Sequence, residues 1–354
     1  MEKAPVPPTV PNDWHLELLR GIAAVLVVVA HYGPASGLNL GVLAFAFTGV
    51  DLFFVLSGFV FAPYLSGKPL HAPAHFVRRL FRLYPLYALA LACYAWLRWQ
   101  PGISGSLLLK HALFLQTLES RDIAFHFNPA FWSLPPEVEF YLALPILAAC
   151  AGRVRYLAGT ALLALFLHGT LALLAARTPD LNTASILLIH LPGLLIEFLL
   201  GTLAWQLAQK NPGRLARLFL ALLGGTLWWL LARCFVQLGD AGIENIIWLR
   251  NNVGLFVAAS FALITLAWVG SVPHPPVWLH SLATFSGNLS YGVYLFHGAA
   301  PLVLAPCHPY LSAASFTLLC FAATVLTAYL LHRFWEAPWR RYGRTLAYRF
   351  ESRP

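Results

Sequence analysis

The sequence predicts an all-α integral membrane protein with about ten transmembrane helices in one bundle and both termini in the cytoplasm. Only 10% of its 354 residues are charged and 59% are hydrophobic, whereas soluble globular domains carry about 25% charged residues. Apolar runs of about twenty residues recur along the chain, and helices of that length cross a hydrocarbon core of about 30 Å. The chain therefore has too little polar surface to face water on all sides.

Ten apolar runs are expected to span the membrane within one domain at residues 16–336. They cover roughly residues 16–32, 42–64, 80–98, 135–151, 155–176, 186–208, 215–236, 247–269, 288–305 and 312–334. The weaker stretch 106–118 contains a lysine and a histidine, which favours an interfacial or re-entrant helix. Residues 1–15 are expected to form a disordered cytoplasmic tail, and residues 337–354 a basic cytoplasmic tail.

Lysines and arginines gather at alternate ends of the predicted helices. Basic residues are frequent in the connections near 68–82, 153–155 and 210–217 and in the C-terminal tail, and the opposite loops contain few. With an even number of spans, the positive-inside rule places both termini in the cytoplasm. The net charge of +9 is thus explained by membrane orientation, so we expect the lipid bilayer as a partner and no nucleic acid.

The cysteine pattern argues against metal and disulfide chemistry. The five cysteines are scattered, and no pair has the spacing of metal ligands, so we expect neither a disulfide framework nor a metal site. The chain also lacks the short motifs of P-loop ATPases, serine hydrolases and zinc proteases.

Arg20 and His31 are ionisable residues inside the first apolar run, where such side chains are expensive and often functional. They are eleven residues apart, about three helical turns, and so share a helix face about 16 Å apart along the axis. A neutral imidazole can take a proton from a hydroxyl, as a general base must. The alternative is that Arg20 extends to the interface and His31 only bonds near a helix end.

Two carboxylates stand out among the next segments. Asp51 lies within the apolar run TGVDLFFVLSGF and needs a cation or a histidine that it can orient. Glu137 opens the helix predicted at 135–151, where it could merely compensate the helix dipole.

Arg79 and Arg82 lie in HFVRRLFRLYPLY, three residues apart on one helical face. This geometry suits phosphate oxygens, although ordinary anchoring at the cytoplasmic interface would also explain it. Further along, His297 lies within a predicted span, and Glu336 either pairs with Arg333 or Arg340 or has a function of its own.

In chain order, these segments resemble the acyltransferase-3 family of membrane acyltransferases, whose bacterial members O-acylate cell-surface and secreted glycans. The resemblance extends from Arg20 to about Arg344 and includes the Arg-x10-His spacing. The other matching segments are GVDLFFVLSGF, RLFRLYPLY, FWSLPPEVEFY, LSYGVYLFH and FWEAPWRR.

The resemblance implies transfer of an acyl group, usually acetyl, from acyl-coenzyme A to a hydroxyl, with no permanently bound cofactor. The expected acceptor is a carbohydrate or another hydroxylated molecule, and the expected location is the bacterial cytoplasmic (inner) membrane. For catalysis we expect His31, Asp51 and Glu137, and for the coenzyme Arg20, Arg79 and Arg82.

Three alternatives stay open at this level. His31, oriented by Asp51 or Glu137, could activate the hydroxyl for direct attack, or His31 could itself be acylated. Buried charges could also line the path of a transporter or flippase for lipid-linked sugars. Aromatic residues around the outer segment 99–133 could stack on sugar rings or form an interfacial belt.

Overall fold

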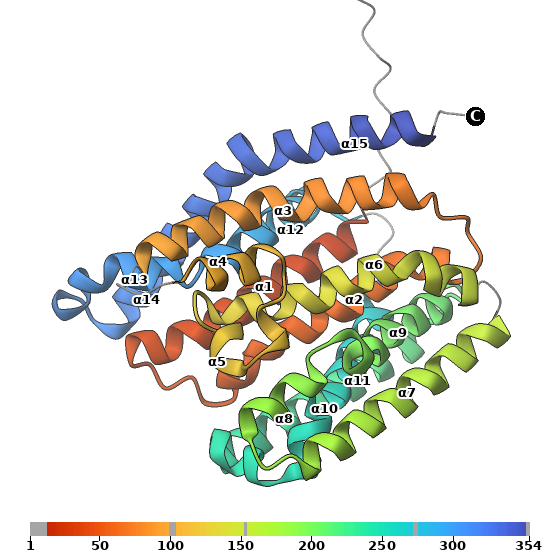
Figure 1. Cartoon of the computed structure of the whole chain (residues 1–354), viewed down its shortest axis with the longest axis horizontal. Coiled ribbons are helices and arrows are strands. Elements are labelled where there is room, and N and C mark those ends of the chain that lie inside the picture. Colours follow the sequence, from red (N-terminus) through yellow and green to blue (C-terminus); the bar gives the residue numbers. More distant parts are fainter. Residues whose placement is uncertain (1–12, 99–103, 152–153, 272–274, 352–354) are drawn as a thin grey trace, which may run out of the picture.

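The computed structural model describes residues 13–98, 104–151, 154–271 and 275–351. These residues fold into helices, with no strand among them, so the all-α prediction is confirmed. Most of the long helices lie side by side along one direction (Figure 1). Residues 1–12 of the predicted N-terminal tail lie outside the described ranges. The first helix already begins at Trp14, where the carboxylate of Asp13 accepts a hydrogen bond from the His15 N–H at 3.0 Å.

The long helices form most of the molecule. They are α1 (Trp14–Ser36), α2 (Gly49–Leu65), α3 (Ala72–Leu97), α6 (Leu134–Ala151), α7 (Val154–Arg177), α9 (Leu191–Ala208), α10 (Arg214–Asn245), α11 (Ile247–Trp268), α12 (Val277–Phe296), α14 (Ala313–Leu331) and α15 (Ala337–Glu351). The short helices are α4 (Gly105–Ala112), α5 (Arg121–Ala124), α8 (Leu181–Leu188) and α13 (Ala299–Leu304).

Eight helical segments of the described residues are long and apolar enough to cross a membrane, which confirms a multi-pass integral membrane protein. Helices α6 and α12 lie in the two other regions predicted to span and are not among the eight, so the count of ten stays a prediction. The bounds predicted for the ninth span, 288–305, were wrong. Helix α12 already begins at Val277 and ends at Phe296, and α13 follows as a separate short helix.

The C-terminal part is more helical than the predicted basic tail. Helix α14 continues through a π-helical turn at His332–Glu336 into α15, which runs alongside α3 (Figure 1). A Cβ atom on Gly343 of α15 would lie 2.3 Å from Cβ of Phe81 on α3, so the two helices are in close contact. The stretch 106–118, by contrast, yields only seven residues of α4 and a single 3₁₀ turn, too short to span a bilayer.

Helices α2 and α9 cross at two glycines. A Cβ on Gly58 would lie 1.7 Å from the carbonyl oxygen of Phe198, and one on Gly201 would lie 1.9 Å from that of Val55. The Thr202 hydroxyl donates a hydrogen bond to the carbonyl of Gly58 at 3.1 Å. Such close approach of backbones is how small residues hold membrane helices together, and here it fixes the helix that carries Asp51.

We expect Gly58→Ala to destabilise the protein by about 1–3 kcal/mol, because the added methyl group has no space and the two helices must separate. The measurement is thermal unfolding in detergent. Gly225→Ala is the control, because a Cβ on Gly225 of α10 would meet nothing within 4 Å. If both variants melted together with the wild type, the crossing would not be tight.

Candidate active site

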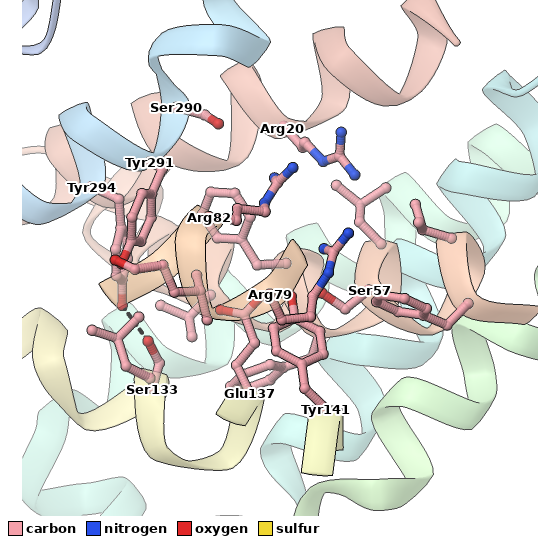
Figure 2. A pocket seen from close by; sticks show the side chains of 18 residues that line it. Arg20, Ser57, Arg79, Arg82, Ser133, Glu137, Tyr141, Ser290, Tyr291 and Tyr294 are labelled. Atoms are coloured by element: carbon pink, nitrogen blue, oxygen red, sulfur yellow. Dashed lines mark hydrogen bonds between the residues drawn. The ribbon is translucent and has the colours of Figure 1, made fainter. Parts of the chain in front are cut away.

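A cavity with about 710 Å³ of empty space, counting its opening to solvent, lies between α1, α2, α3, α6 and α12. Its polar lining comes from all five helices and from the turn before α6 (Figure 2). The polar residues are Arg20, Ser57, Arg79, Arg82, Ser133, Glu137, Tyr141, Ser290, Tyr291 and Tyr294. Four of the six predicted site residues, the three arginines and Glu137, therefore meet in one cavity.

Arg79 and Arg82 project from one face of α3, as their spacing predicted, and line the cavity together (Figure 2). The guanidinium of Arg79 lies over two aromatic rings, 5.0 Å from the centre of Phe61 and 5.4 Å from that of Tyr141. In the part of the chain that the structure describes, neither arginine forms an ion pair with a carboxylate. Nε of Arg79 is buried without a hydrogen-bond partner there.

The other two predicted residues of the cavity have local partners. Arg20 forms an ion pair with Glu17, one turn earlier on α1, at 2.5 Å. Glu137 accepts a hydrogen bond from the hydroxyl of Tyr141, one turn later on α6. Both side chains are thereby held facing the cavity.

His31 lies farther along α1 and is not part of the cavity lining. Its Nδ1 bonds to the backbone carbonyl of Val27 at 2.8 Å. A carbonyl only accepts, so Nδ1 carries the proton and Nε2 keeps a free lone pair. An imidazole in this form is ready to act as a base. The expected orientation of His31 by Asp51 or Glu137 is corrected here, because the structure shows neither carboxylate in contact with it and the backbone holds the ring instead.

Asp51 is paired with a residue that the sequence interpretation missed. Its carboxyl group lies beside that of Glu197 on α9, and the two groups interact. A Cβ on Gly254 of α11 would lie 2.9 Å from Glu197 Oε1 and 3.4 Å from Asp51 Oδ1. Glu197 is only 2% exposed, and its position inside the apolar run 186–208 was the signal that could have found it.

The structure also places the remaining residues that the sequence singled out. Glu336 accepts hydrogen bonds from Arg340 at 3.2 Å and from His332 at 2.9 Å, so of the two arginines considered it pairs with Arg340. Phe127 and Phe131 of the outer segment are wholly buried and pack in the core, out of reach of a sugar. Among the described residues, no three His, Cys, Asp or Glu side chains gather as metal ligands would.

Comparisons with known proteins agree with one another. A family model, acyltransferase-3, described as an acyltransferase domain, matches residues 13–333. A protein of the Acidianus two-tailed virus named "Putative acetyltransferase ORF330" is 27% identical over 295 residues, which cover 80% of this chain and 82% of that protein. The Staphylococcus aureus (strain COL) protein named "Putative O-acetyltransferase SACOL0978" is 23% identical over 365 residues.

The extent of these matches differs. The staphylococcal alignment covers 93% of this chain but only 57% of the relative. A Rhizobium radiobacter protein named "Protein 2 in picA locus" is 44% identical over 85 residues, which cover 23% of this chain and 42% of that protein. No solved structure matches the chain.

Proposed function

This chain belongs to the acyltransferase-3 family and is a membrane-embedded acyltransferase, and we propose that it takes an acyl group, foremost acetyl, from acyl-coenzyme A on the cytoplasmic side. The acceptor in this proposal is a hydroxyl of a cell-envelope or exported glycan, and the location is the bacterial cytoplasmic membrane. Membership in a family of acyltransferases speaks against the alternative of a sugar transporter.

The observation that carries the donor half of the proposal is the cavity with three arginines. Arg79 and Arg82 face it without a carboxylate partner in the described structure. Unpaired charges inside a membrane protein are costly. Phosphate groups of a coenzyme would offset that cost by charge-assisted hydrogen bonds, which guanidinium groups form in bidentate geometry.

The length of the pantetheine arm of the coenzyme matches the distance between Arg20 and His31 along α1. Arg20 and His31 are eleven residues apart, or about 16 Å along the helix. The pantetheine arm has a dozen covalent bonds between its phosphate and its sulfur, so it reaches roughly 14 Å when extended, by the scale of an extended polypeptide backbone. Phosphates near the arginines would therefore leave the thioester close to the level of His31.

The chemistry that we propose at that level is direct transfer. Nε2 of His31 takes the proton of the acceptor hydroxyl while the oxygen of that hydroxyl attacks the thioester carbonyl. The carbon–sulfur bond then breaks, and the proton passes to the leaving thiolate to give free coenzyme A. In the rival route, Nε2 itself attacks the carbonyl and an acyl-imidazole carries the group to the acceptor.

The proposal is tested with purified protein in nanodiscs and acetyl-coenzyme A that carries a radiolabel in its acetyl group. With a pool of bacterial envelope glycans present, we expect release of free coenzyme A and transfer of label to the glycan, and neither in empty nanodiscs. Incubation without the acceptor, followed by rapid denaturation at neutral pH, separates the two routes, because only the rival route would leave label on the protein as an acyl-histidine. Absence of thioester turnover with acetyl, propionyl and longer donors would reject acyl-coenzyme A as the donor.

A further inference from the structure

His31 is accompanied by a second histidine that no part of the mechanism above uses. His297 follows the last residue of α12, and its ring centre lies 4.9 Å from that of His31, with the two ring planes inclined by 49°. Helices α1 and α12 are neighbours in the bundle (Figure 1). His297 is 1% exposed, whereas His31 keeps part of its surface open.

Both rings have the same tautomer. Nδ1 of His297 bonds to the backbone carbonyl of Tyr294 at 2.8 Å, as Nδ1 of His31 does to that of Val27. Each Nδ1 must donate, because a carbonyl oxygen only accepts, and so each Nε2 keeps a lone pair. Two acceptors cannot bond to each other, and in the described structure no protein donor satisfies either Nε2.

The position of His297 is firmly held and adjoins the cavity. Its backbone carbonyl accepts a hydrogen bond from the Tyr32 hydroxyl at 2.9 Å, and that hydroxyl also bonds to Thr324 on α14 at 2.5 Å. Tyr294, which holds its Nδ1, lines the cavity, and its hydroxyl bonds to Ser133 (Figure 2). Contacts from α1, α12 and α14 thus hold the Nε2 lone pair of His297 in place beside that of His31.

We propose that His297 is a specificity-determining residue that accepts a hydrogen bond from a second hydroxyl of the acceptor, next to the one that reacts. The acceptor class is then a vicinal diol. This inference rests on the proposed function. The reacting hydroxyl gives its proton to His31 and its oxygen to the acyl carbon as the carbon–sulfur bond breaks, while the neighbouring hydroxyl keeps its O–H bond. Two adjacent hydroxyl oxygens lie about 2.8 Å apart and each reaches a nitrogen at about 2.8 Å, which fits rings at this separation.

The test compares two small alcohols with labelled acetyl-coenzyme A in nanodiscs: trans-cyclohexane-1,2-diol, and cyclohexanol, which lacks the second hydroxyl. We expect the wild type to favour the diol by about 10- to 100-fold in kcat/KM, since cyclohexanol would leave the buried Nε2 of His297 without a hydrogen-bond donor. His308→Asn, a change at an exposed histidine of the segment Ala305–Tyr310, should leave this ratio as in the wild type.

Two variants of His297 test the roles of its two ring nitrogens separately. In His297→Gln the amide oxygen takes the place of Nε2, so the diol preference should persist. In His297→Asn the amide nitrogen takes the place of Nδ1 and keeps the bond to Tyr294, but the Nε2 acceptor is lost and the ratio should fall to about one. Acetyl-coenzyme A binding and gel-filtration profiles of both variants establish that they fold.

The opposite pattern, a normal ratio in the Asn variant and a reduced one in the Gln variant, would show that His297 only supports the helix end. Equal use of the two alcohols by the wild type would also overturn the inference, while the acyltransfer itself stood. Failure to turn over acetyl-coenzyme A under any condition would instead reject the proposed function, and this inference with it.

Discussion

His31→Ala is expected to lower acetyl transfer by about 1,000-fold while leaving the protein folded, because removal of a general base costs about 10²–10⁴ in rate. In the described structure, the one side-chain hydrogen bond of His31 is to the carbonyl of Val27 on its own helix, so its loss should not loosen the bundle. The measurement is the rate of label transfer from acetyl-coenzyme A in nanodiscs, with binding of the coenzyme measured in parallel.

The matched control for this prediction is His308→Ala, since His308 is an exposed histidine that does not line the cavity. It should retain wild-type rates. If His31→Ala kept more than about a tenth of the wild-type rate with normal coenzyme binding, another residue would have to be the base, and the proposed mechanism would fail.

Replacement of both Arg79 and Arg82 by glutamine is expected to raise the KM for acetyl-coenzyme A by about 100-fold or more, since each charged hydrogen bond to phosphate is worth about 1.5–3 kcal/mol and two are lost. The same variant should use acetyl-pantetheine, which has the thioester arm but no phosphate, as well as the wild type does. The measurement is kcat and KM for the two donors, which separates loss of phosphate binding from loss of structure.

Arg78→Gln is the control for the two cavity arginines. Arg78 is the preceding residue of α3, but it points away from the cavity and forms an ion pair with Glu351 of α15 at 2.5 Å. Its replacement should change neither donor's KM. A comparable loss with acetyl-pantetheine in the double variant would mean that the arginines hold the fold and not the phosphates.

The sequence by itself determined the class of the protein and most of its helices. Low charge content and apolar runs of about twenty residues indicate a bundle of membrane helices, each of which satisfies its own backbone hydrogen bonds. The long elements of the described chain are helices. Pairs of residues on one helix could also be predicted from the sequence, because helical spacing alone places Arg79 and Arg82 on the same face. That these two arginines meet Arg20 and Glu137 in one cavity was decided by the packing of the helices that carry them.

Boundaries at the ends of the apolar runs were harder to predict. Helix α12 begins among residues that were interpreted as a connection, and α15 continues as a helix through residues that were interpreted as a tail. In both places the sequence is too polar or too interrupted by proline to resemble a span. Packing against a neighbour stabilises the helix there, as Gly343 does against Phe81.

Only the tertiary structure decided which polar side chains became partners. The depth of Asp51 in the membrane required a partner, but the sequence did not indicate which residue it would be. The partner is Glu197, 146 positions later in the chain, which the crossing of α2 and α9 brings close. His31 proved to be held by its own backbone and to face His297 on α12. Helical periodicity fixes which residues share a face, but contacts between distant helices depend on how they cross, and that is set by packing over the whole bundle.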